Sequence, residues 1–500
     1  MKNLVGRALG FLLLLSLPAV TLAQTAPSGS ASKVDGIWLG ALHAGPQTLR
    51  IQLRLQAAAQ SCALDSIDQK AFGIPCSNVA VNGNAVSFDV PSVSGKWSGN
   101  LSADGKTLTG TWTQGGALPL VLERQTTALE APKAVAPAFD AAMPAVKAED
   151  LKPVLDRDLA AAMTSGELAP ATEGGVTVGV VSHGVRRIFS YGAAKPDSVF
   201  EIGSISKTFT ALLLAQMVQQ GTVKLDEPVR ELLPAGTVAK PTGGEITLLD
   251  LSDQHSGLPR MPDNFHPADP ANPYADYDAK LLYAYMGKQG VALTPNAPFG
   301  YSNLGVGLLG QALADRASMK YADLLREQII GPLGMHDTGI GLTAEMKARF
   351  IDGHDGEHRA AHAWDIDALA GAGGIRSTAA DMLTYLEAQL HPENLPHSDL
   401  ASPQGKTLPA AIAACHVIHA DVGQGMHIAL NWLRVDATGS YWHNGATGGY
   451  SAYAMFNPEK DFAVVVLSNT SISATGSFAD KLGEHVAQRL SGAPAIVLAP

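Results

Sequence analysis

The pattern of hydrophobic and polar residues predicts strands in the first part of the chain. Residues 49–55 alternate between apolar and polar side chains, as a half-buried strand does. Asn82-Gly83 and Asp104-Gly105 stand between further short alternating runs, and these dipeptides favour tight hairpin turns. We therefore expect a small all-β module, a barrel or sandwich, over residues 33–125. It holds no cluster of acids, histidines or nucleophiles, which favours an accessory module that packs or binds.

After residue 150 the pattern mixes helices and strands. Apolar periodicity predicts a helix over 151–163, strands over 176–181 and 187–191, and a helix-rich stretch over 204–390. Strands return at 450–456 and 462–467, and a helix follows over 478–490. Strands at both ends with helices between them predict an α/β (α+β) fold. In it an antiparallel sheet is built from both ends of the domain, is flanked by helices and has a helical subdomain beside it. This domain spans residues 151–500.

The remaining segments predict export and a linker. Lys2 and Arg7 precede an apolar run over 8–17, and small residues follow to Ala23, which is the layout of a cleavable signal peptide over 1–23. The run is shorter than the roughly 20 residues that span a bilayer, so we expect no stable membrane insertion and a periplasmic or secreted protein. Residues 24–32 suit a flexible tail, and the Ala/Pro-rich residues 126–150 suit a linker.

Charge and cysteine usage narrow the classes of partner. The net charge is −11, with no long basic block, so we expect no nucleic-acid partner. Cys62 and Cys76 lie in one compact stretch, and an oxidising compartment favours a disulfide between them; two unpaired buried thiols are the alternative. Cys415 has no motif around it and is expected to be a buried structural thiol.

The strongest candidate for a nucleophile is Ser204. It follows a predicted strand over 198–202 and Gly203, and it precedes a helix over 207–220. Backbone N–H groups at such a helix start favour a developing anion, and Lys207, one helical turn on, shares the face of Ser204. A serine hydroxyl needs a neighbouring base, which a buried lysine near other cations can provide.

Two weaker motifs accompany it. Tyr301 and Asn303 lie in a turn before an apolar helix over 304–313. Tyr301 could relay a proton from Ser204 to a leaving group, provided nearby cations lower its pKa from about 10, and Asn303 could hold a substrate amide. A packed tyrosine in a helix-initiating turn is the alternative.

The third motif, His443-Asn-Gly445, precedes Ala446 and a glycine-rich strand. Glycines let a substrate lie along a strand edge. The backbone N–H groups of Ser204 and Ala446 could together form an oxyanion hole.

The three motifs in this order resemble the serine β-lactamase and penicillin-binding-protein superfamily. Residues 200–210 are similar to the nucleophile segment of class C β-lactamases, and residues 246–259, 371–378, 443–450 and 467–469 also resemble that branch. The resemblance covers about residues 151–490. It implies a serine hydrolase that uses no metal or other cofactor and takes a small-molecule or peptidoglycan-derived substrate, a β-lactam or a D-Ala-type peptide. The implied roles are nucleophile for Ser204, proton handling for Lys207 and Tyr301, substrate binding for Asn303, and an oxyanion hole at Ser204 and Ala446.

The third motif departs from the class C pattern. Those enzymes carry Lys-Thr-Gly where this chain has His443-Asn-Gly445. A lysine is a permanent positive charge that can receive a carboxylate, whereas a histidine with an ordinary pKa of about 6.5 is mostly neutral at pH 7. We expect weaker β-lactamase turnover than in a Lys-Thr-Gly enzyme, and a rate that is sensitive to pH near neutrality.

Other functions stay open at this point. The same serine could serve a small-ester esterase or a D-amino-acid peptidase, and a non-catalytic cell-wall binding protein is a remote alternative. His354, His358 and His362 recur every four residues, which on a helix could form a metal face. Because Gly353 and Gly356 disfavour a helix there, we expect a loop with ordinary surface histidines.

Overall fold

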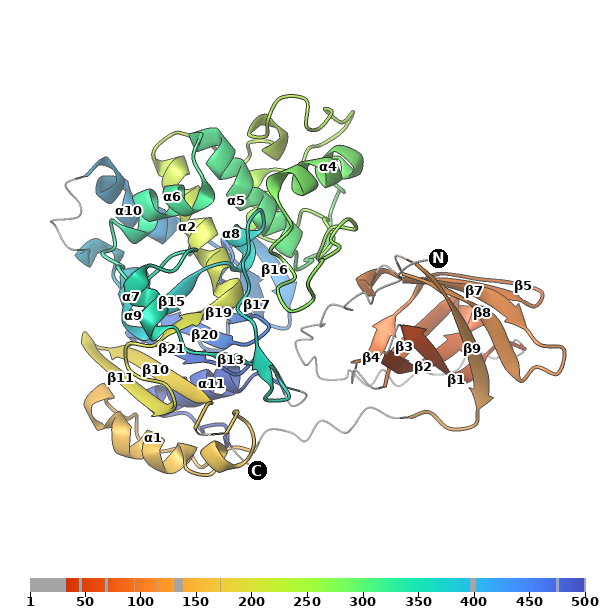
Figure 1. Cartoon of the computed structure of the whole chain (residues 1–500), viewed down its shortest axis with the longest axis horizontal. Helices are drawn as coiled ribbons and strands as arrows, with labels where there is room; N and C mark the ends of the chain where they lie inside the picture. Colours follow the sequence, from red (N-terminus) through yellow and green to blue (C-terminus); the bar gives the residue numbers. More distant parts are fainter. Residues whose placement is uncertain are drawn as a thin grey trace. The chain divides into compact units, whose positions relative to one another are not determined.

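The chain forms two compact units, Met1–Ala136 and Pro137–Pro500 (Figure 1). The computed structural model describes residues 33–44, 47–67, 71–93, 95–114, 116–129, 138–170, 172–395, 402–473 and 476–498. The expected signal peptide over 1–23 and the tail over 24–32 lie outside the described residues.

The first unit is one nine-stranded antiparallel sheet in the order β4-β3-β2-β1-β9-β8-β7-β6-β5. β1 (Gly36–Ala44) pairs with both β2 (Gln47–Gln56) and β9 (Ala117–Gln125), and so joins two meanders. The alternating residues 49–55 fall in β2, and the two predicted hairpin turns connect β5 to β6 and β7 to β8. The remaining strands are β3 (Ser61–Ser66), β4 (Ala71–Pro75), β5 (Ser77–Asn82), β6 (Ala85–Val90), β7 (Gly95–Leu101) and β8 (Thr107–Thr113).

The core of this sheet consists mostly of aliphatic side chains, with large aromatic rings among them. Trp38 and Trp97 are fully buried, and each indole N–H donates to a backbone carbonyl oxygen. Burying a large ring with its polar N–H satisfied is strongly favourable. A disulfide joins Cys62 in β3 to Cys76 just before β5, with a sulfur–sulfur distance of 2.05 Å, and Cys415, in the second unit, is a buried free thiol.

The second unit is built on an eight-stranded antiparallel sheet in the order β11-β10-β21-β20-β19-β18-β17-β16. β10 (Gly175–Ser182) lies between β11 (Val185–Gly192) and β21 (Phe462–Ser468), so strands from both ends of the domain meet as expected. β20 (Ser451–Asn457) and β19 (Ser440–Ala446) follow. The edge strands β16 (Ala420–Gly423), β17 (Met426–Ile428) and β18 (Leu433–Val435) were not predicted, because three or four residues give no periodic signal.

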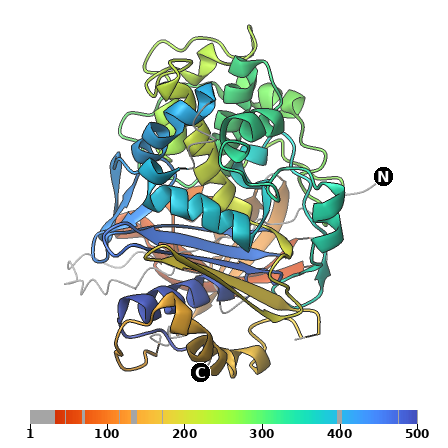
Figure 2. The same ribbon diagram turned by 90° about the vertical axis from the view of Figure 1, so that its left-hand side faces the viewer.

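Helices cover both faces of this sheet (Figure 2). α11 (Phe478–Ser491) repeats apolar residues every fourth position and packs with α1 (Leu151–Leu159) on one face, as an amphipathic helix should. α9 (Ala379–Leu390) covers the other face. α2 (Ser206–Gln219) is buried on almost every side, because it lies inside the helical part and contacts α5 (Asn303–Ala317), α8 (Ala370–Gly373) and α10 (Pro403–Ala414).

The helix-rich middle of the chain is confirmed. Within the described ranges, no helix is long and apolar enough to cross a membrane. The other helices of this part are α3 (Leu248–Ser252), α4 (Ala279–Gln289), α6 (Tyr321–Leu325) and α7 (Ala344–Arg349).

Two stretches differ from the simplest interpretation of the sequence. The second half of the Ala/Pro-rich stretch packs on the second unit, where Asp140 N–H donates to Ala495 O and Val146 N–H to Arg489 O. The segment with three histidines forms neither a helix nor a plain loop. It is a short hairpin of β13 (Gly353–His354) and β14 (Ala360–Ala361), and the described residues include no group of three side chains arranged for a metal.

Candidate active site

Ser204 lies in a single turn of 3-10 helix, Gly203–Ile205, between β12 (Val199–Glu201) and α2. Gly203 has a φ of +50°, in the left-handed region that disfavours a side chain. A Cβ added to Gly203 would lie 2.5 Å from Ala446 N, and one added to Gly445 would lie 2.0 Å from Ile202 O. The two glycines therefore allow β19 to touch the serine turn, which brings the backbone nitrogens of Ser204 and Ala446 to the same place.

The Lys207 side chain is fully buried and contacts three oxygen atoms. Its Nζ lies 3.0 Å from Ser204 Oγ, 2.8 Å from Asn303 Oδ1 and 2.7 Å from Ala372 O. Burial holds the pKa of Lys207 well below its usual range, and the positive charge of Arg260 lowers it further. Ala372, in α8, was not among the residues that the sequence singled out.

The neutral form of Lys207 fits these contacts in one way. A neutral amine has two hydrogens and one lone pair, and the oxygens of Asn303 and Ala372 can only accept. The two hydrogens therefore go to those oxygens, and the lone pair is left for the Ser204 O–H. The site is thus arranged for proton transfer from Ser204 to Lys207.

Tyr301 packs beside this pair. Its ring centroid lies 4.8 Å from Lys207 Nζ and 5.0 Å from Arg260 Cζ. Burial raises the pKa of the Tyr301 phenol, and the Ser204 hydrogen bond and the charge of Arg260 oppose that rise without cancelling it. The condition set from the sequence, that nearby cations lower this pKa from about 10, is therefore not met in net direction, because burial outweighs both opposing causes. The phenol stays protonated at neutral pH.

A network of polar contacts fixes the turn that carries Tyr301 and Asn303. Ser302 is the N-cap of α5: its Oγ accepts from Gly305 N–H at 2.8 Å and donates to Pro259 O at 2.7 Å. Ser302 N–H donates to Gln254 Oε1 at 2.8 Å, and Asn303 N–H donates to Arg260 O at 3.0 Å. The segment over 246–259 thus acts as the support of this turn.

His443 lies in β19, with 5% of its surface exposed. Its Nδ1 lies 2.6 Å from Asn444 O, and since a carbonyl oxygen only accepts, Nδ1 carries the hydrogen. Burial, with the charge of Lys207 as the next cause, lowers the pKa of His443 to about 3. The ring is therefore neutral from pH 5 to 8, which contradicts the expectation that it makes the rate sensitive to pH near neutrality.

A buried ion pair supports the serine turn from behind. Glu201, at the end of β12, accepts from Arg376 Nη2 at 3.3 Å and from Trp364 N–H at 2.8 Å. Arg376 lies in β15 (Arg376–Thr378), which pairs with β12. Burial raises the pKa of Glu201, and Thr447 and the charge of Arg376 oppose that rise. The carboxylate thus links the strand before Ser204 to β15 and to the backbone of Trp364.

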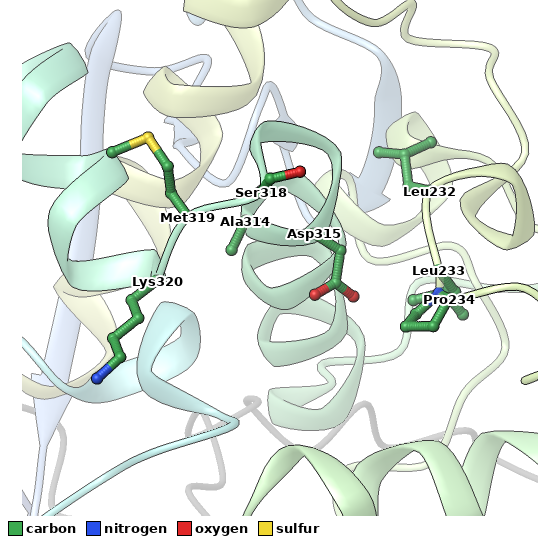
Figure 3. A pocket seen from close by; sticks show the side chains of 8 residues that line it. All are labelled: Leu232, Leu233, Pro234, Ala314, Asp315, Ser318, Met319 and Lys320. Carbon is green, nitrogen blue, oxygen red and sulfur yellow. The ribbon is translucent and has the colours of Figure 1, made fainter.

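The site is distinct from the hollow shown in Figure 3. That hollow lies at the other end of α5, about 18 Å along the helix from Asn303. It contains none of the residues that the sequence predicted for the site. Its lining residues are Leu232, Leu233, Pro234, Ala314, Asp315, Ser318, Met319 and Lys320.

We predict that Gly445→Ala lowers hydrolysis of a chromogenic ester at least about 100-fold, because displacing β19 by an ångström misplaces the backbone N–H groups at Ser204. Gly341→Ala is the matched control, since an added Cβ there meets no atom within 4 Å. Both rates and melting temperatures are measured. Wild-type activity in a folded Gly445→Ala protein would contradict the predicted close contact.

Known proteins share the sequence pattern of the second unit. The beta-lactamase family model matches residues 161–488. The D-alanyl-D-alanine-carboxypeptidase/endopeptidase AmpH of Escherichia coli (strain K12) is 28% identical over 334 residues, 64% of this chain and 86% of that protein. A beta-lactamase of Pseudomonas fluorescens is 28% identical over 365 residues, 64% of this chain and 94% of that protein.

Solved structures share its fold. A class C beta-lactamase from Rhodobacter sphaeroides superposes with a TM-score of 0.54 at 24% identity, covering 64% of this chain and 94% of that one. A second class C beta-lactamase has a TM-score of 0.56 at 21% identity, covering 67% and 95% of the two chains. With its family match over residues 161–488, this chain belongs to the β-lactamase family, as a serine hydrolase of the β-lactamase and DD-carboxypeptidase type.

Proposed function

We propose that this protein is an exported hydrolase that cleaves the amide of a D-Ala-type peptide or a β-lactam through an acyl-enzyme on Ser204. The observation that carries the proposal is the buried Lys207 Nζ, 3.0 Å from Ser204 Oγ, with its other two contacts made to oxygens that only accept. Burial lowers the pKa of Lys207 well below its usual range, which favours the neutral amine that can act as the base.

In the acylation step the Ser204 O–H gives its proton to Lys207 while Oγ bonds to the substrate carbonyl carbon. The backbone N–H groups of Ser204 and Ala446 hold the resulting oxyanion. The phenol of Tyr301 then donates its proton to the leaving nitrogen and takes the proton from Lys207, so the amine departs and the acyl group stays on Ser204. A protonated phenol, which burial favours, suits this role of acid.

In the deacylation step a water molecule takes the place of the amine. Its proton passes to Lys207 as its oxygen bonds to the acyl carbon, and Ser204 Oγ recovers a proton as the acid leaves. Asn303 orients Lys207 through its Oδ1, and its amide N–H group is the group we assign to the substrate.

Two observations bear on the substrate. The similarity to a D-alanyl-D-alanine-carboxypeptidase/endopeptidase supports a peptide substrate. The neutral His443 lacks the permanent charge of a lysine, which supports weaker turnover of β-lactams.

The signal-like residues 1–23 and the Cys62–Cys76 disulfide both suit a periplasmic or secreted protein.

We predict that brief incubation with a penicillin adds the mass of one drug molecule to the wild-type protein and adds nothing to Ser204→Ala. Intact mass spectrometry measures both, and the lifetime of the adduct separates a fast β-lactamase from a slowly deacylating peptidase. If the folded wild type forms no adduct, the esterase or D-amino-acid peptidase alternatives take precedence.

We also predict that kcat/KM falls as the pH drops through the pKa of Lys207, because the neutral amine is the base. The decline should persist in His443→Gln, since His443 is already neutral above a pKa of about 3. It should also persist in Asp480→Asn, although burial raises the pKa of Asp480 to about 6 and its Oδ2 accepts from Asn444.

The pH profiles of both variants are measured on one ester substrate. His183→Gln, in which the replaced ring is exposed, is the control. An acidic limb that disappears in either site variant would assign the limb to that residue and contradict the role of Lys207.

A further inference from the structure

Arg260 is placed at the site by its backbone. It follows the turn over residues 256–259, and its carbonyl oxygen accepts from Asn303 N–H at 3.0 Å and from Leu304 N–H at 3.1 Å. These bonds fix Arg260 against the first turn of α5, and its guanidinium lies over the Tyr301 ring at 5.0 Å. The charge of Arg260 therefore stands beside Tyr301 and also acts on Lys207.

The guanidinium of Arg260 has no anionic partner within the part of the chain that the structure describes. In the second unit, the other described arginines that are at least partly buried pair with a carboxylate, whereas the charge of Arg260 is met by the aromatic face of Tyr301. Arg124 of the first unit also stacks on a ring, but it donates its N–H groups to backbone carbonyl oxygens. A stacked guanidinium keeps all five of its N–H donors available. The paired arginines are Arg230 with Glu245, Arg316 with Glu227, Arg349 with Asp337, Arg376 with Glu201, Arg434 with Asp436 and Arg489 with Asp158.

Aromatic side chains and a thioether lie near Arg260. Met261 follows Arg260 in sequence, and its Sδ lies 3.9 Å from the hydroxyl oxygen of Tyr274. The charge of Arg260 acts to lower the pKa of Tyr274, against the larger effect of burial. Tyr274 packs on Trp364 with ring centroids 5.2 Å apart. In such aromatic surroundings a charge is weakly screened, so an approaching anion is attracted more strongly than in water.

The other basic groups of the site cannot take this anion. Lys207 is fully buried and its two acceptor contacts use the hydrogens of its neutral form. His443 carries its hydrogen on Nδ1, which is used by Asn444 O. Burial lowers the pKa of His443 to about 3, so the residue at the place of the class C lysine is uncharged. Arg260 supplies a positive charge from a different loop, the one after residues 256–259.

We propose that Arg260 binds an anionic group of the substrate, a carboxylate, and so sets a preference for negatively charged acyl donors. The inference rests on the proposed function, because it requires that the substrate is held at Ser204. A planar guanidinium binds a carboxylate through two parallel N–H···O bonds, which also orients the substrate relative to the nucleophile.

The test uses two pairs of aryl esters. The first pair differs only in a carboxylate or a carboxamide on the acyl group, and the second has the same difference on the leaving group. The readout is the ratio of kcat/KM for the charged ester to that for the neutral ester within each pair. A ratio removes any common effect of Arg260 on Lys207 or Tyr301.

We predict that the wild type prefers the charged ester in at least one pair and that Arg260→Met lowers that ratio at least about tenfold, the loss expected for a charge-assisted contact. Arg260→Lys keeps the charge without the planar fork and should keep part of the preference. Arg187→Met is the matched control, since Arg187 is exposed on β11. Melting temperatures identify any variant that fails to fold, and Arg260→Lys then serves alone.

Two outcomes would overturn the proposal. One is a wild type with no preference in either pair, and the other is an unchanged ratio in folded Arg260 variants, which would leave Arg260 as a support of Tyr301 only. If the proposed function itself is incorrect, the result is different: Ser204→Ala then hydrolyses all four esters as fast as the wild type.

Discussion

The interaction on which the site depends is the burial of Lys207 without a carboxylate at contact distance among the described residues. An isolated charge in a protein interior is so costly that the group gives up its proton instead. The contacts at Nζ then decide what the neutral amine does: two oxygens that only accept take its hydrogens, and the serine hydroxyl faces its lone pair. Base and nucleophile are thus matched before any substrate arrives, which lowers the reorganisation needed during the reaction.

The fold serves this arrangement by bringing together four distant segments. The sheet joins strands from both ends of the domain, and that pairing carries Ala446 in β19 to the serine turn. α5 presents Asn303, and α8 presents Ala372. α2 holds Lys207 fully buried, and that burial is the main cause of its low pKa. The same packing therefore stabilises the core and excludes solvent from the amine of Lys207.

Much of this could be predicted from residue patterns. The strict alternation over residues 49–55, the helix that begins near Ser206 and the strands of both domain ends are long and periodic, so their type was clear. The residues of the three motifs do meet around Ser204. Short strands near the sheet edge, such as β16 and β17, were not predicted, because their pairing depends on the neighbouring strands more than on their own sequence.

The properties of the site that the sequence did not predict are electrostatic. The sign of the pKa shift of Tyr301 and the neutral state of His443 depend on how deeply each ring is buried, and no local pattern encodes that depth. Arg260 escaped because it belongs to no motif with Ser204 in sequence; only the fold places it over Tyr301. Its position directly after the turn over residues 256–259, a segment already linked to the family, was the one available signal.

The charge state of Lys207 can be observed directly by NMR of protein labelled with carbon-13 at the lysine side chains. The Cε signal that is missing in Lys207→Met belongs to this residue, and its chemical shift reports whether the amine is protonated. We predict that this signal has the shift of a neutral amine at pH 8 and changes to that of the ammonium form as the pH is lowered. A Lys207 signal that stays in the ammonium position from pH 6 to pH 9 would contradict it.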